Sequence, residues 1–114
     1  MRRDAARLED IRAACVDIAA LIPGKTLEQF GGDLAFRYAV LHCLMIIGEA
    51  SNQLSPDLTA RHPDIPWRDI IGLRHRVVHD YAGLDLQIIW DVVERLVPPL
   101  HERVVRLLGN ALTC

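Results

Sequence analysis

Cysteine is scarce in this sequence of 114 residues. The three cysteines, Cys15, Cys43 and Cys114, are odd in number, widely spaced and never in a CxxC pair. They therefore predict neither a disulfide framework nor a zinc knuckle. We expect them to behave mainly as small buried hydrophobic residues.

The sequence also lacks long apolar runs. Its N-terminus, MRRDAARLED, has no apolar stretch after the basic residues, and the longest nearly apolar run, YAVLHCLMIIG, is too short to cross a bilayer. We therefore expect a cytoplasmic protein without membrane contact. Since 51% of the residues are hydrophobic, the length predicts a single globular domain over residues 1–114 that buries a core without disulfides or metal.

Excess positive charge is absent as well. The net charge of -2 argues against a protein that binds nucleic acid mainly through an overall positive charge. The segment from Arg61 to His79 differs, because it has four arginines and three histidines against only Asp64 and Asp69. These side chains form either a basic patch or a scattered, solvated set, and composition leaves both interpretations open.

The apolar residues recur with helical spacing. A first helix ends before Pro23 and Gly24, and its stripe consists of Leu8, Ile11, Cys15, Ile18 and Ile22. After a segment that we expect to be a loop, Asp33 can cap a second helix that runs to about Leu54. This helix is apolar almost all round, which requires either a central position or burial against a second copy of the chain.

The second half of the chain is helical too. Residues 55–66 contain three prolines, although Ser55 and Pro56 can cap a short helical turn. The next helix runs from Pro66 through WRDIIGLRHRVVHDY towards a stop at Gly83, and Asp85 caps the last helix, which Pro98 and Pro99 should kink. No strand-like alternation appears, so we predict an all-α antiparallel bundle of four main helices with a short extra helical turn.

The segment GLRHRVVHDY, residues 72–81, combines charged, imidazole and phenol side chains on one helix. At 100° per residue, Val77 and Tyr81 belong to the face expected to be buried. His75 and His79 share a second edge, and Arg76 and Asp80 a third. The simplest interpretation of the third edge is an exposed ion pair worth at most about 0.5 kcal/mol.

The two histidines allow two interpretations. Side chains at i and i+4 can both reach one zinc ion, but no third His or Cys stands at a recognisable spacing, so partly exposed surface histidines are the simpler interpretation. Glu49 also stays open between two roles. It is either an exposed carboxylate at the end of the apolar run or a group that orients Arg74 or a histidine of the segment.

The order of these residues resembles a known family. In this segment four residues separate Arg74 from His79, and one residue separates His79 from Tyr81. This spacing resembles the signature of the HEPN superfamily and of its HepT branch, the toxin half of HepT/MNT toxin-antitoxin modules. His75 stands where most members have Asn. The stretches RLEDI, IIGEASNQLSP, HPDIPWRDIIGLRHRVVHDYAGLDLQIIWDVV and PPL also resemble HepT sequences in the same order.

This resemblance implies a HEPN-like bundle that forms a homodimer and acts as a metal-independent endoribonuclease without a cofactor. His79 would be the general base or acid, and Arg74 the phosphate clamp, with His75 and Glu49 supporting them. The resemblance further implies that the Tyr81 hydroxyl accepts AMP from a cognate MNT nucleotidyltransferase antitoxin, which would place negative charge beside the cation meant for RNA.

The helix geometry adds a constraint on this site. Arg74 and His79 diverge by about 140° on a regular helix, so they do not converge on one small target. Either the helix frays before His79, or the site combines residues from two chains.

A second class of function also remains open. The chain would then be a catalytically weak HEPN subunit that docks a nucleotidyltransferase or binds nucleotide. The chain has no GSx10DxD-type motif, so it is not the AMP-transferring partner itself.

Overall fold

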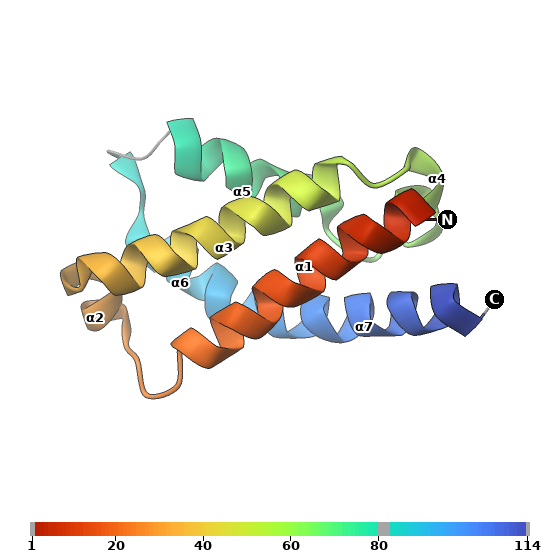
Figure 1. The fold of residues 1–114 in the computed structure, drawn as a ribbon. Coiled ribbons are helices and arrows are strands. Elements are labelled where there is room, and N and C mark those ends of the chain that lie inside the picture. Colours follow the sequence, from red (N-terminus) through yellow and green to blue (C-terminus); the bar gives the residue numbers. More distant parts are fainter. Residues whose placement is uncertain (1, 80–82, 114) are drawn as a thin grey trace.

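The computed structural model describes residues 2–79 and 83–113, and these residues form a helical bundle without a strand (Figure 1). The long helices are α1 (Arg2–Leu21), α3 (Leu34–Asn52) and α5 (Trp67–His79). The fourth long segment is continuous and consists of α6 (Leu86–Asp91), the π-helical η2 (Val92–Leu96) and α7 (Val97–Thr113). The predicted all-α bundle of four main helices is therefore confirmed.

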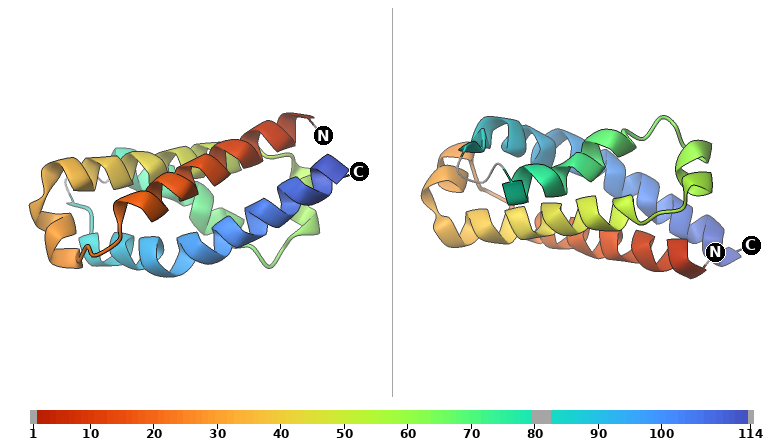
Figure 2. Two further views of the ribbon diagram at one scale, coloured as in Figure 1. Left: turned by 60° about the horizontal axis from the view of Figure 1, so that its bottom comes forward. Right: turned by 90° about the horizontal axis from the view of Figure 1, so that it is seen from above.

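The core forms around α3, which lies between α1 and α5 (Figures 1 and 2). Its side chains Val40, Leu44 and Ile47 are completely buried. Helix α1 contacts α3 on one side and α7 on the other, which closes the bundle. The apolar character of α3 is thus explained by its central position.

Helix α3 is also long and apolar enough to cross a membrane by length and composition alone, with 19 residues and a mean hydropathy of 1.3. Half of that window is buried inside the protein, and core helices of soluble proteins satisfy the same test. We therefore treat α3 as the core helix of the bundle.

The predicted caps are present. The side chain of Asp33 accepts a hydrogen bond from the Phe36 amide at 3.1 Å, and Asp85 accepts one from the Gln87 amide at 3.0 Å. Ser55 caps the short helix α4 (Pro56–Arg61), the predicted extra turn. Buried Asp4 accepts hydrogen bonds from the Ser55 amide and hydroxyl at 2.8 and 2.7 Å, so α1 and α4 are held together.

Between α1 and α3 the prediction of a loop was wrong, because a short helix α2 (Leu27–Gly32) forms there. Thr26 and Gln29 make a capping box at its start. Its Phe30 is fully buried and lies 5.2 Å from the Trp90 ring, measured between ring centroids. Tertiary packing of one aromatic side chain therefore stabilises a helix too short to be stable alone.

Helix α5 begins at Trp67, directly after Pro66, and continues to His79. The expected stop at Gly83 follows residues 80–82, which lie outside the described part of the chain. Among the described residues, α3 is the only helix with which α5 makes extensive contact. The helix that contains Arg74 and His79 is therefore attached to the bundle along one side.

The kink expected at Pro98 and Pro99 stays a prediction, but the structure has a π-helical turn, η2, shortly before them. Here the Val97 amide donates to the Val92 carbonyl, five residues back. A proline ring clashes with the carbonyl four residues earlier in an α-helix, so a wider turn gives the two rings room.

Candidate functional site

Arg74 lies on the exposed surface of α5 and faces α3. Its Nε is 2.8 Å from Oε2 of Glu49, and the two side chains are 51% and 42% exposed. The guanidinium is therefore held by a carboxylate from a neighbouring helix while half of it stays open to solvent. Of the two sequence-based roles for Glu49, its contact with Arg74 agrees with the orienting one.

Glu49 has a second partner at the C-cap of its own helix. The Nε2 group of Gln53 donates a hydrogen bond to Oε1 of Glu49 at 2.9 Å, one helical turn further on. One carboxylate oxygen thus contacts Arg74 and the other accepts from Gln53. A carboxylate that has a partner on each oxygen fixes the position of the guanidinium better than a carboxylate with a single partner would.

Gly48 allows the close approach of α3 and α5 that this ion pair requires. A Cβ added at Gly48 would lie 2.8 Å from the Arg74 backbone nitrogen and 3.1 Å from the Ile70 carbonyl oxygen. The neighbouring backbone therefore occupies the space that any other residue would need. The glycine directly before Glu49 sets the distance across which Glu49 reaches Arg74.

His75 and His79 lie on the adjacent edge of α5, and both are exposed. Their ring centroids are 4.5 Å apart with an angle of 34° between the planes. Because α5 continues to His79, the expectation that the helix frays before this residue is wrong. Arg74 and His79 therefore diverge around one regular helix.

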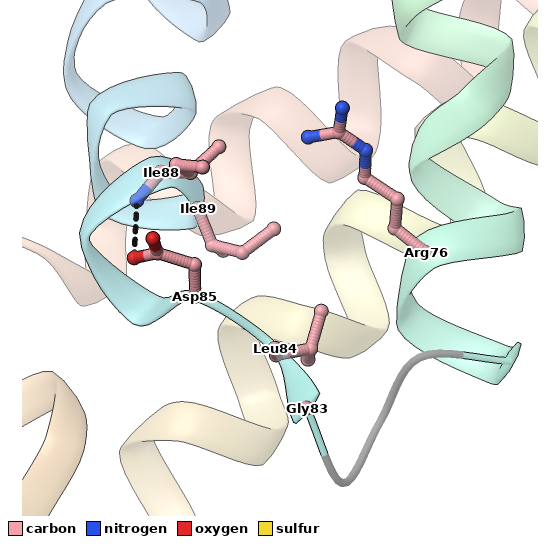
Figure 3. Close-up of a pocket in the computed structure, with 6 residues that line it drawn as sticks. All are labelled: Arg76, Gly83, Leu84, Asp85, Ile88 and Ile89. Atoms are coloured by element: carbon pink, nitrogen blue, oxygen red, sulfur yellow. Dashed lines mark hydrogen bonds between the residues drawn. The ribbon is translucent and has the colours of Figure 1, made fainter.

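Arg76 projects from a third edge of α5. It lines a cavity of about 260 Å³ together with Leu84, Asp85, Ile88 and Ile89, and Figure 3 shows it reaching from α5 towards the side of α6. The predicted ion pair between Arg76 and Asp80 stays a prediction, because Asp80 lies outside the described part of the chain. The same is true of Tyr81, so its expected burial and modification stay predictions.

A second cavity, of about 340 Å³, adjoins Arg74 on its α3 side. Its polar lining consists of Glu49, Gln53, Arg74 and Arg7, the last of these from α1. Its apolar lining consists of Met45, Ile46 and Ala50, all from α3. Residues from three helices thus line an open pocket that has two guanidinium groups and one carboxylate.

The basic segment of the sequence divides into two parts in the structure. Arg61 pairs with Asp57 within α4, and Asp64 pairs with Arg103 of α7, which holds the pKa of the Asp64 carboxyl below its ordinary value. The arginines and histidines of α5 are exposed instead. Because these side chains lie on different edges of α5, both interpretations of the basic segment, a patch or a scattered solvated set, stay open. Over residues 2–79 and 83–113, no group of three or more potential metal ligands comes together.

These features define a class of protein: an all-helical bundle in which one exposed helix presents arginine and histidine from adjacent edges. The sequence model of the family described as "Ribonuclease HepT-like" matches residues 11–107. The chain belongs to this family.

The names of similar proteins agree with this assignment. The chain is 34% identical over 97 residues to "Putative RNase MJ1380" of Methanocaldococcus jannaschii, which covers 85% of this chain and 89% of that protein. It is 35% identical over 100 residues to "Probable ribonuclease HepT" of Thermococcus cleftensis, covering 88% of this chain and 91% of the relative. No solved structure matches the chain significantly.

Sequence reasoning missed three residues around Arg74. Gln53 had a weak signal, since it stands four residues after Glu49 on the same helix. Gly48 had none beyond its position in an apolar helix. Arg7 lies 67 residues from Arg74, so only the packing of α1 shows that they line one cavity.

Proposed function

We propose that this chain is the toxin of a toxin-antitoxin module and acts as a metal-independent endoribonuclease through Arg74 and His79. The observation that supports this most is the arrangement at Arg74. A guanidinium is held by Glu49, stays half exposed, and lies on the same helix as His79. Membership of the ribonuclease HepT-like family and the names of the relatives point to RNA as the substrate.

The proposed reaction uses a nucleophile that RNA itself provides. The 2'-hydroxyl attacks the adjacent phosphorus as a base removes its proton, and the bond to the 5'-oxygen of the next nucleotide breaks as that oxygen gains a proton. The products are a 2',3'-cyclic phosphate and a 5'-hydroxyl. Imidazole suits either proton transfer near neutral pH, and such catalysis contributes on the order of 10²- to 10⁴-fold.

Arg74 would stabilise the negative charge that develops on the phosphorane oxygens, since a guanidinium stays charged and can contact two oxygens at once. His75 packs against His79 at 4.5 Å between ring centroids and would restrict the orientation of the catalytic ring. The chemistry needs no resident cofactor because proton transfer and charge stabilisation suffice.

The complete site would belong to a homodimer. Arg74 and His79 diverge by about 140° on α5, so one chain does not direct both at one phosphate. A two-fold axis that places two α5 helices side by side would bring Arg74 of one protomer near His79 of its partner.

The cognate antitoxin would be an MNT nucleotidyltransferase that transfers AMP to Tyr81. This tyrosine stands two residues after His79 in the sequence. An added AMP group would bring a negative phosphate and steric bulk to the end of α5, in competition with RNA phosphate for Arg74. Enzyme, antitoxin and RNA would meet in the cytoplasm.

The experiment is end-mapping of RNA incubated with the purified protein in a chelator. We expect cyclic-phosphate ends with the wild-type protein, their loss in His79→Ala, and their retention in His42→Ala, which removes an exposed histidine of α3. Cleavage that appears only with added divalent cations would contradict metal independence. Intact RNA together with a tight nucleotidyltransferase complex would favour a docking subunit instead.

Mixing two inactive variants tests whether the site is shared. If Arg74 and His79 act across a dimer, Arg74→Ala and His79→Ala each abolish activity, but mixed dimers contain one intact pair. About a quarter of the wild-type activity should then return after mixing and subunit exchange, because half of the dimers are mixed and each has one of two sites. A mixture without activity, despite mixed dimers, would place the site within one chain.

A further inference from the structure

The cavity beside Arg74 has the composition of a site for a nucleotide. Its volume of about 340 Å³ lies within the range of small-molecule sites, roughly 300–1,000 Å³. Apolar side chains of α3 form part of its wall, while polar side chains of α1, α3 and α5 converge on it. A few polar groups on an apolar wall are typical of sites that orient a flat, partly polar ligand.

Arg7 provides a largely unused cation in this cavity. Within residues 2–79 and 83–113, its Nε is buried without a hydrogen-bond partner, and its one ion pair, from Nη1 to Asp10, is long at 3.4 Å and exposed. Because the ion pair with Asp10 is long and exposed, it holds the Arg7 guanidinium only weakly. The Nη groups of Arg7 are therefore more available to an incoming anion than those of a guanidinium held by a close carboxylate would be.

The charges in the cavity also favour an anion. Arg7 and Arg74 contribute two positive charges, and Glu49 contributes one negative charge. Arg74 contacts Glu49 through Nε, and in the described part of the chain its Nη groups have no acceptor, so they can bind an incoming one. The lining therefore has a net charge of +1, which suits one phosphate diester.

Gln53 and the apolar wall suit a base. Gln53 donates one N–H to Glu49. Among the described residues its second N–H and its side-chain carbonyl oxygen have no partner, which leaves a donor and an acceptor side by side. Such a pair matches the hydrogen-bonding edge of a nucleobase. The wall includes Met45, whose thioether makes favourable contacts with aromatic rings.

We propose that this cavity binds the RNA nucleotide next to the scissile phosphate, with Arg7 on its phosphate, Gln53 on the edge of its base and Met45 and Ile46 against the ring. This inference rests on the proposed function, because Arg74 connects the cavity to the reacting phosphate. It adds to that function a substrate-positioning residue, Arg7, and a residue that determines base preference, Gln53.

Binding of a fluorescent single-stranded oligoribonucleotide to His79→Ala protein tests the role of Arg7 without cleavage. Adding Arg7→Ala should weaken binding about tenfold and lower the salt-dependence slope by about 0.7, the value for one phosphate contact on a single strand. Arg12→Ala is the matched control, since it removes the same charge from the same helix at a residue paired with Glu9. Equal effects of the two variants would overturn the proposal.

A variant with the opposite expected effect separates binding from misfolding. Asp10→Asn removes the carboxylate partner of Arg7 and should tighten oligoribonucleotide binding, which no loss of structure can produce. Unchanged or weaker binding by Asp10→Asn, at unchanged thermal stability, would count against Arg7 as a phosphate ligand.

Cleavage kinetics and end-mapping test Gln53. In otherwise wild-type protein, Gln53→Leu should raise KM more than it lowers kcat and should flatten the base composition at the position next to the cut. An unaltered base distribution would overturn its assigned role. If wild-type protein cleaves no RNA, the proposed function fails, but the binding comparison of Arg7 and Arg12 still reports on the cavity.

Discussion

At the scale of single residues, Glu49 determines how Arg74 is presented. One oxygen of its carboxylate lies against the Arg74 Nε and the other accepts from Gln53, so the guanidinium has a defined orientation although half of it is exposed. An ion pair with this exposure contributes little to folding, typically about 0–1 kcal/mol. Its importance should therefore lie in orientation and not in stability.

Replacing Glu49 with Gln should separate the two contributions. We expect the free energy of unfolding to change by less than about 1 kcal/mol, because the lost pair is exposed. The kcat for RNA cleavage should fall about tenfold as the guanidinium loses its orientation, a cost of about 1.4 kcal/mol. KM should not rise, because one negative charge facing the RNA is removed.

The matched control is Glu102→Gln, which removes the carboxylate of another exposed ion pair, with Arg106 on α7. It should leave both kcat and KM unchanged. Full activity in Glu49→Gln would take Glu49 out of the site.

The sequence predicted part of this site. A short motif indicated Arg74, His75 and His79, and a carboxylate at the end of an apolar run indicated Glu49. Both features are local in the sequence. Arg7 was not, because its relation to Arg74 depends on how α1 packs against the rest of the bundle. A single sequence contains the residues of such a cavity but not their distances.

At the scale of helices, the contact between α3 and α5 depends on one glycine. The Arg74 backbone nitrogen lies 2.8 Å from where a Cβ of residue 48 would be, so α5 sits closer to α3 than a side chain at this position would allow. Ser51 and Ile47, on the flanking turns, are buried. The separation of the two helices is thus set at the point where the ion pair forms.

Gly48→Ala should push the helices apart. Overpacking of this kind costs typically about 1–3 kcal/mol, and it should lower RNA cleavage as well because Arg74 moves away from Glu49. Thermal denaturation and cleavage rates measure both effects. Gly72→Ala is the control: this glycine of α5 has open space around its Cβ position, so alanine should be neutral or stabilise the helix by up to about 1 kcal/mol. Similar destabilisation by both variants would contradict the packing role of Gly48.

Helices could be predicted from the sequence where local signals were strong. The caps at Asp33 and Asp85 and the turn after Ser55 follow from side chains that bind nearby amides. Helix α2 was missed since burial of Phe30 against Trp90 is not a local property. The prolines predicted a kink, but not the π-helical turn that precedes them.

At the scale of the whole molecule, the core responds to pH through a thiol. Burial raises the pKa of Cys15 to about 12, with a smaller contribution from Cys43, whose pKa is raised as well. The unfolded chain ionises near the ordinary value, about 8.5, while the folded protein keeps Cys15 protonated. The stability associated with this proton is therefore complete below pH 8.5 and decreases as the pH rises towards 12.

Urea unfolding under reducing conditions between pH 8 and 11 measures this effect. We expect the wild-type protein to lose up to roughly 1.4 kcal/mol per pH unit through Cys15 over the upper part of that range. Cys15→Ala lowers the stability at every pH through the cavity it leaves, but its slope against pH should be shallower. The comparison uses the slope of the unfolding free energy against pH, because all other groups titrate equally in both proteins. Parallel slopes would contradict the assignment of the pH dependence to Cys15.

The attachment of α5 along a single side affects how the bundle opens in time. Regions with few buried contacts unfold locally at a lower free energy than the domain as a whole, and their amides exchange with solvent deuterium first. Among the described helices α5 makes extensive contact with α3 alone, whereas α1 packs on both α3 and α7, so α5 should separate from the bundle before α1 does. A ligand that spans α1, α3 and α5 would then slow amide exchange in α5 more than in α1.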